Sequence, residues 1–230
     1  MEAVRPGQLF FYLNIMKKTF LAVFFLTAFV CPSYAQVTGG LKAGLNIANM
    51  HPSEGENPKA RLGFHLGGYL QVPISEELSF QPEALYSSMG AKETFDDRYN
   101  DGFNEIHEKG EFVANLNYLS FPLLFAYKFG QVSLFAGPTL SFLLNAKGKY
   151  DVTVYVDSDE VLSESGSQKL KEAKDLDFGL NIGLGYDFGP INASARYYAG
   201  LSNVVDNDEG NETVKNGAFQ ISLGVKLQQK

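Results

Sequence analysis

The sequence predicts an all-β protein, an eight-stranded antiparallel up-and-down transmembrane β-barrel. From about residue 39 onward, large apolar residues alternate with small polar ones in about eight segments. This is the period of a β-strand that has one apolar and one polar face. The connections between the segments are long and short in turn, as in barrels whose two ends face different compartments. Together the two patterns indicate a barrel of the bacterial outer membrane.

The alternation is clearest between residues 176 and 188, where every second position is a large apolar residue and the others are Asp, Asn or Gly. Extended along the chain, the same pattern predicts the eight strands. They cover residues 39–50, 61–73, 78–88, 111–128, 132–144, 176–188, 191–202 and 217–228.

Short turns are predicted at residues 74–77, 129–131 and 189–190, and the last two contain the Gly and Pro typical of tight turns. The other connections are predicted as extracellular loops, with both chain termini in the periplasm. Within the longest loop, Ser167 is expected to cap a short helical turn over residues 167–174. The four loops are expected around residues 51–60, 89–110, 145–175 and 203–216.

The N-terminal region has the pattern of a secretory signal peptide over residues 16–35. Lys17 and Lys18 precede about a dozen mostly apolar residues, and small residues lead to a cleavage point after Ala35. A membrane-spanning helix is disfavoured because the apolar run is too short. Residues 1–15 are interpreted as an over-called upstream start, and residues 36–230 as a single barrel domain.

The cysteine content excludes a disulfide from the mature chain, and the net charge argues against nucleic acid as a partner. Cys31 is the only cysteine and lies in the predicted signal peptide, so the mature chain has no disulfide. The formal charge of −7 becomes −9 once residues 1–35, with three basic residues and one acidic residue, are removed. Such an acidic chain is not expected to bind nucleic acid.

Alternation alone does not say which face of each strand points inward. A soluble lipocalin-like carrier also has about eight strands, but it buries the apolar face. Three features favour the membrane barrel: the polar face is rich in Gly, Asn and Ser, aromatic residues gather near strand ends, and the loops are asymmetric. The expected location is therefore the outer membrane of a Gram-negative cell.

Several segments also resemble a known family. They are Gly40-Leu41-Lys42-Ala43-Gly44-Leu45-Asn46, Phe80-Gln81-Pro82-Glu83-Ala84-Leu85-Tyr86-Ser87, Leu116-Asn117-Tyr118-Leu119-Ser120-Phe121-Pro122-Leu123, Leu134-Phe135-Ala136-Gly137-Pro138, Asp177-Phe178-Gly179-Leu180 and Phe219-Gln220-Ile221-Ser222-Leu223-Gly224. In this order they resemble the PorT-like, porin-family outer-membrane β-barrels of Bacteroidota. The resemblance implies fold and location. The family is named after a component of a protein-secretion and gliding apparatus. Membership alone does not transfer the role of that component.

The predicted lumen contains charges on the inward-facing side of several strands. A salt-bridge network is expected there because an eight-stranded barrel is just wide enough for side chains to fill it. A proton or ion path through the same residues is the alternative. The expected members are Lys42, Glu83, Arg196 and Lys226.

The sequence offers little catalytic chemistry. The sequence has three histidines, of which His65 is expected to face the lumen. His51 and His107 lie on different predicted loops and have no Ser-based or Cys-based motif around them, so no catalytic residue is assigned and no enzyme is predicted. Residues 97–108 partly match a calcium-loop register, but Tyr99 replaces a ligand and no helix is predicted on either side. Residues 206–210 are a weaker match. No metal or cofactor site is assigned.

The expected function is therefore a structural or binding role carried by the long acidic loops. Expected partners are outer-membrane lipid, lipopolysaccharide and an extracellular or envelope protein. The alternatives are a small porin-like channel, a component of a secretion apparatus and, third, the soluble carrier. The expected binding surface consists of Asp97, Tyr99, Asp101, Phe103, Glu108 and Tyr155.

Overall fold

The computed structural model describes residues 37–53, 58–100, 102, 104–157, 159–206 and 213–227. The predicted signal peptide at residues 16–35 and the segment 1–15 lie outside these residues. The described residues form nine β-strands: β1 (Thr38–Pro52), β2 (Lys59–Pro73), β3 (Leu78–Asn100), β4 (Glu105–Phe129), β5 (Val132–Val156), β6 (Asp159–Lys169), β7 (Leu176–Asp187), β8 (Ile191–Gly200) and β9 (Val214–Leu227).

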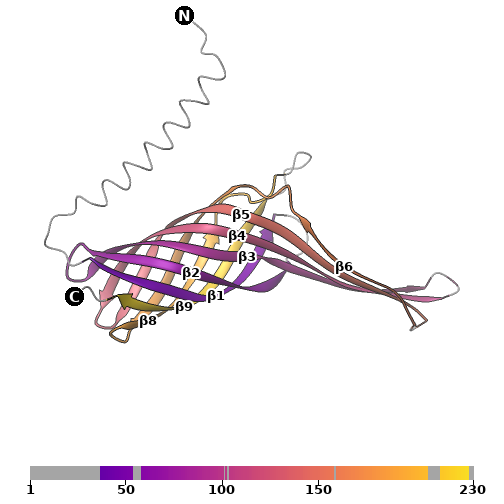
Figure 1. The fold of residues 1–230 in the computed structure, drawn as a ribbon, viewed down its shortest axis with the longest axis horizontal. Helices are drawn as coiled ribbons and strands as arrows, with labels where there is room; N and C mark the ends of the chain where they lie inside the picture. Colours follow the sequence, from indigo (N-terminus) through magenta and orange to yellow (C-terminus); the bar gives the residue numbers. More distant parts are fainter. Residues whose placement is uncertain are drawn as a thin grey trace, which may run out of the picture. The chain divides into compact units, whose positions relative to one another are not determined.

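Eight of the strands close into a barrel. Each strand pairs antiparallel with its neighbours in the order β4-β3-β2-β1-β9-β8-β7-β5, and a pairing between β4 and β5 completes the ring (Figure 1). β6 is added outside the ring and pairs with β5. The predicted all-β, eight-stranded, antiparallel up-and-down barrel is therefore confirmed.

The short turns lie together at one end of this barrel. They join β2 to β3, β4 to β5 and β7 to β8. Gly130 and Gly189 have positive φ values of 61° and 92°, a conformation that a residue with a Cβ rarely adopts. The pair Gly39 and Leu227 places the first and last described strand ends at this same end.

Three barrel strands, β3, β4 and β5, continue far beyond the other end of the barrel, and β6 joins them there. The last residue of β2 that pairs with β3 is Lys59, opposite Lys92, whereas β3 and β4 stay paired out to Asn100 and Glu105. β5 follows them to Val156, and β6 pairs along its outer side. β3, β4, β5 and β6 thus form a single-layer projecting sheet (Figure 1).

This extension corrects the expected loops at residues 89–110 and 145–175, most of which are strand. Their density of charge suggested loops, but a sheet with water on both faces can carry charged side chains on either. The expected helical turn at 167–174 is also wrong, because residues 167–169 belong to β6 and Ala173 bridges to Val205.

Within the described part of the chain, no helix is long and apolar enough to cross a membrane.

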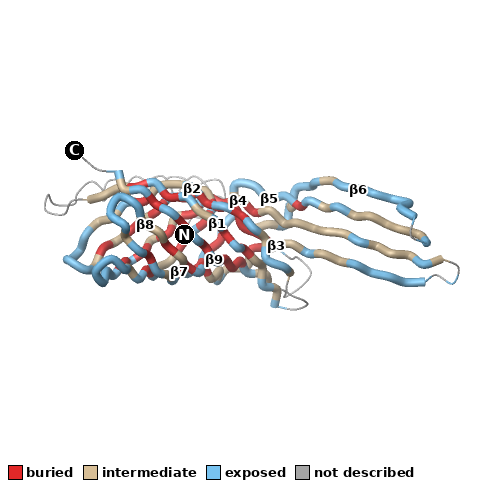
Figure 2. The backbone as a smooth tube through the Cα atoms, turned by 90° about the horizontal axis from the view of Figure 1, so that it is seen from below, coloured by how far each residue is buried: buried red, intermediate tan, exposed pale blue. Residues whose placement is uncertain are grey.

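Burial follows the alternation inside the barrel. On β7, Leu180 and Ile182 are 48% and 59% exposed, while Asn181 between them and Asp177 on the same polar face as Asn181 are buried. Figure 2 shows buried residues along the barrel, whereas the projecting strands are exposed or intermediate. The polar faces therefore point into the lumen and the apolar faces point outward.

Candidate functional site

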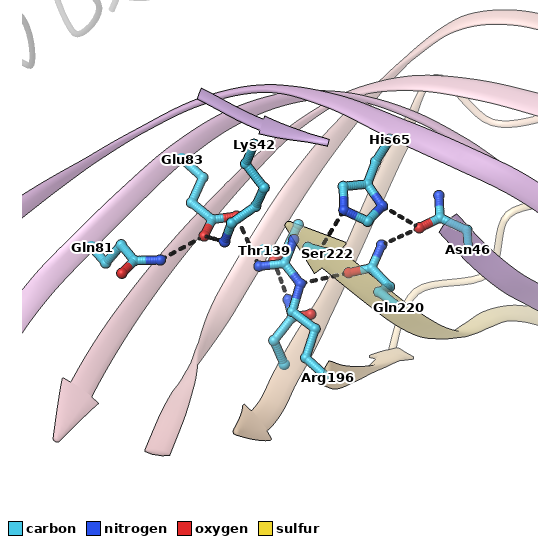
Figure 3. Close-up of polar contacts among 10 residues, drawn as sticks. Lys42, Asn46, His65, Gln81, Glu83, Thr139, Arg196, Gln220 and Ser222 are labelled. Atoms are coloured by element: carbon cyan, nitrogen blue, oxygen red, sulfur yellow. Dashed lines mark hydrogen bonds and ion pairs between the residues drawn. The ribbon is translucent and has the colours of Figure 1, made fainter. Parts of the chain in front are cut away.

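An ion-pair cluster lies inside the barrel. Lys42 on β1 and Arg196 on β8 both contact the carboxylate of Glu83 on β3 (Figure 3). Arg196 Nη1 lies 2.8 Å from Glu83 Oε2, and Gln81 Nε2 donates to Glu83 Oε1 over 2.8 Å. All four residues are buried. One carboxylate thus forms ion pairs with two cations in a space that water hardly reaches.

A chain of neutral polar groups continues from this cluster. Arg196 Nε donates to Gln220 Oε1 over 2.7 Å, and Gln220 Nε2 donates to Asn46 Oδ1 over 2.8 Å. His65 bridges Asn46 and Ser222, with Nδ1 2.7 Å from Asn46 Oδ1 and Nε2 2.8 Å from Ser222 Oγ (Figure 3). Asn46 Nδ2 donates to the Ser88 carbonyl. That contact fixes Oδ1 as the acceptor facing the imidazole.

The Ser222–His65–Asn46 order is that of a nucleophile, a base and an orienting group. Ser222 and His65 are each 1% exposed, and Asn46 is 0% exposed. The adjoining lumen pocket beside Arg196, Gln220 and other side chains holds about 10 Å³, which is space for about one water molecule. These hydrogen bonds cross-link β1, β2 and β9 in the closed interior of the barrel.

A second buried cluster lies nearer the projecting sheet. Asp177 Oδ2 accepts from Asn216 Nδ2 over 2.8 Å, and Asp177 Oδ1 accepts from Ser202 Oγ over 2.7 Å. Asn216 Nδ2 also donates to Tyr118 OH over 3.1 Å. Tyr118, Tyr198 and neighbouring apolar residues pack around this cluster. Side chains therefore also fill the end of the lumen that lies nearer the projecting sheet.

Lys226, the fourth expected member of the lumen network, lies elsewhere. Its ammonium group contacts Asp187 near the short-turn end, and Lys128 Nζ lies 4.0 Å from the same Asp187 oxygen. The structure thus brings Lys42, Glu83 and Arg196 together and separates Lys226 from them.

Sequence reasoning did not assign Asn46, Gln220 and Ser222 to the network. Each lies on the polar face of a predicted strand, so the alternation alone could have placed them in the lumen. Their partners depend on how the strands pair around the ring. For example, Ser222 and His65 are 157 positions apart in sequence.

The outer surface of the barrel is apolar. Aromatic pairs lie near the short-turn end, with ring centroids 4.6 Å apart for both Tyr127–Phe129 and Tyr186–Phe188. Phe129 and Phe188 are each 62% exposed. An apolar outer band flanked by aromatic residues is what lipid requires. It is the reverse of the soluble carrier alternative, which needs the apolar faces inside.

A comparison with known protein families also indicates an outer-membrane β-barrel. A family model described as outer membrane protein beta-barrel domain matches residues 34–206. The chain belongs to this family. Its location is the outer membrane. No curated protein matches the sequence significantly.

Several solved outer-membrane proteins resemble this family member. Ail, the attachment invasion locus protein of Yersinia pestis, is 15% identical with a TM-score of 0.43, covering 83% of this chain and 98% of Ail. Neisserial surface protein A is 14% identical with a TM-score of 0.40, covering 82% and 97%. A major outer membrane protein of Thermus thermophilus is 13% identical with a TM-score of 0.39, covering 84% and 100%.

Four of the six residues expected to form the loop surface of this outer-membrane protein lie on the projecting sheet. Asp97 on β3 is directly opposite Glu108 on β4, and Tyr99 OH donates to Glu108 Oε1 over 3.2 Å. These three residues share one face of the sheet. Tyr155 lies on the opposite face, where its ring stacks on His107 with centroids 5.6 Å apart. Asp101 and Phe103 lie outside the described residues.

The calcium-loop hypothesis is not supported by the described part of residues 97–108. This segment is a strand hairpin rather than a loop wrapped around a central point, as the pairs Asp97–Glu108 and Asn100–Glu105 show. Among the residues that the structure describes, no group of three or more His, Cys, Asp or Glu side chains is placed to hold a metal ion. Most of the weaker match at 206–210 lies outside them.

We predict that His107→Leu, which removes the hydrogen-bond donor, raises the pKa of Asp96. His107 Nε2 lies 2.8 Å from Asp96 Oδ1, and this hydrogen bond lowers the pKa of the carboxyl. A lowered carboxyl pKa means that the contact supports the sheet above the ordinary aspartate pKa and is lost as pH falls through the lowered value. An NMR titration of Asp96 in both proteins measures the shift. Equal pKa values would contradict the prediction.

Proposed function

We propose that this outer-membrane protein is a non-enzymatic binding protein in which the barrel is the scaffold and the projecting sheet is the binding surface. The observation that carries the proposal is the continuation of β3, β4 and β5, joined by β6, beyond the barrel in a single layer. Strands that leave the membrane are not needed to close the barrel. We expect the sheet to be extracellular and to bind an extracellular or envelope protein, beside outer-membrane lipid and lipopolysaccharide.

The filled lumen supports binding over conduction or catalysis. The Lys42–Glu83–Arg196 cluster occupies the middle of the barrel, and the Asp177 cluster lies beyond it. Water-filled channels are formed by barrels of about sixteen strands or more. We expect pure protein in planar bilayers to give no stable, reproducible current steps. Membership in the PorT-like group is supported by the sequence motifs alone, and that membership does not by itself transfer a secretion role.

A clean truncation tests the proposal. Lys92, Val113, Lys149 and Ser167 lie in one row across the four strands. Residues 93–112 and 150–166 can therefore each be replaced by an Asn-Gly turn, since two residues suffice to join directly paired positions. All barrel pairings stay intact in this trimmed protein.

We predict that the trimmed protein still inserts into the outer membrane and keeps heat-modifiable gel mobility, because its ladder hydrogen bonds remain. Its partner, captured by cross-linking on intact cells, should be lost completely. Capture of the same partner by the trimmed protein would refute the proposed function. Loss of heat-modifiable mobility would refute the scaffold role of the barrel.

A further inference from the structure

The projecting sheet has two chemically different faces. Direct cross-strand pairing places Phe95, Ile106, Phe112, Val152, Val154 and Leu162 on one face. This face, called here the lumen-side face, continues the side that carries Met89, Leu116 and Ala146 inside the barrel. Its central residues are only partly buried. Within the described part of the chain, the sheet has no second layer (Figure 2).

The charges are also divided between the two faces. The lumen-side face carries only acidic charges among the described strand residues: Glu93, Asp97, Glu108, Asp159 and Glu164. The basic residues of the same strands have the opposite orientation and lie on the outer face. They include Lys92, Arg98, Lys109, Lys147 and Lys149. The lumen-side face therefore has an apolar central surface, called here the apolar floor, and only negative charges among its described strand residues.

Glycines flatten this floor. A Cβ added to Gly110 would lie 2.3 Å from Phe95 Cζ, so the Phe95 ring occupies the space above Gly110. The Tyr150 ring lies over Gly166 in the same way, where an added Cβ would be 2.5 Å from the phenol oxygen. Aromatic rings laid across neighbouring glycines make a broad, level apolar surface that a partner can approach closely.

The acidic groups on this face have no cation beside them among the described strand residues that share it. Asp97 and Glu108 are directly opposite each other, an arrangement that is destabilising for like charges. Glu108 and Glu164 instead accept hydrogen bonds from Tyr99 and Tyr150 over 3.2 and 3.3 Å. A positively charged partner would relieve the repulsion between Asp97 and Glu108 while covering the apolar floor.

We propose that the lumen-side face binds a cationic, apolar polypeptide segment of the partner, in which basic and apolar side chains alternate or share one face. This rests on the proposed function and names the chemistry of its partner. A second copy of the chain would bring carboxylates against carboxylates. The anionic phosphates of lipopolysaccharide would be repelled likewise. Apolar contact and charge complementarity together therefore select a basic segment.

A synthetic peptide of alternating Lys and Val tests this proposal. About ten residues suffice, since a strand of that length spans roughly 33 Å. Binding is measured by fluorescence anisotropy to the full chain in nanodiscs of zwitterionic lipid, with empty nanodiscs subtracted. We expect saturable binding that weakens with salt. A Glu–Val peptide of equal length should not bind.

Matched variants locate the site. E108K/E164K reverses two charges on the lumen-side face, and D151K/E160K makes the same net change on the outer face. We expect the first to weaken binding by roughly tenfold or more, since it replaces two attractive contacts with repulsive ones. The second should change affinity less than about threefold. V152T/V154T keeps β-branched side chains and should also weaken binding, because it removes apolar contact.

The outcomes separate this inference from the proposed function. Equal weakening by the two charge variants would show attraction to net charge alone and overturn the inference. So would full peptide affinity in V152T/V154T, or in the trimmed protein. If the trimmed protein loses its cellular partner while the lumen-side variants keep it, the inference fails and the proposed function stands. Heat-modifiable mobility of every variant verifies that the barrel is folded.

Discussion

Replacing Glu83 with Gln is expected to be the most damaging single change in the barrel. Glu83 is the carboxylate that both Lys42 and Arg196 contact, and all three side chains are buried. The amide has the same shape but no charge, so two cations would remain in the lumen without a counter-ion. Breaking a buried ion pair in this way costs about 3–5 kcal/mol of unfolding free energy. Urea titration in lipid vesicles, followed by far-UV circular dichroism, measures it.

Lys42→Met is the matched control for Glu83→Gln. It removes one of the two cations and leaves the Glu83–Arg196 pair, with Nη1 and Oε2 2.8 Å apart. We expect a smaller loss of about 1.5–3 kcal/mol, the scale of a single hydrogen bond to a charged group. If Glu83→Gln fails to fold at all, removing all three charges together should restore folding. Equal losses in Glu83→Gln and Lys42→Met would contradict the idea that charge balance holds this cluster.

The strand faces could be predicted from sequence because their physics is local. Alternation along residues 176–188 is set by the two-residue period of the strand, and lipid outside the barrel requires one apolar face. The same argument put Lys42, Glu83 and Arg196 in the lumen. It could not separate Lys226, because its distance from the cluster along the barrel depends on register. The ring of pairings sets Lys226 opposite Gly40, near the short-turn end.

The projecting sheet could not be predicted because its stabilising contacts are not local. Residues 93–100 carry a high density of charge, which is typical of loops in membrane barrels. They form strand because β4 supplies a partner at every position, from Glu93 opposite Phe112 to Asn100 opposite Glu105. β6 depends in turn on β5. Apolar and polar residues still alternate in these segments. Water contacts both faces of the projecting sheet, however, so the apolar positions in the sequence pattern stand out only weakly.

Replacing Ile182 with Arg is expected to destabilise the barrel although Ile182 is 59% exposed. Ile182 lies near the middle of β7, between Phe178 on one side and Tyr186 on the other. At a water-facing position, such a substitution changes stability by about 0.5 kcal/mol or less. In a lipid-facing position near the bilayer midplane, arginine costs roughly 2–4 kcal/mol. We expect the larger value, measured by urea titration in lipid vesicles.

Ile74→Arg provides the control, because Ile74 is 56% exposed but lies in the turn between β2 and β3. Near the membrane interface the cost of arginine falls to about 0–1 kcal/mol. The two positions have almost the same exposure and receive the same substitution, but they differ in depth in the bilayer. Equal effects at Ile182 and Ile74 would mean that lipid does not surround β7. A large difference requires that the exposed apolar band of the barrel faces hydrocarbon.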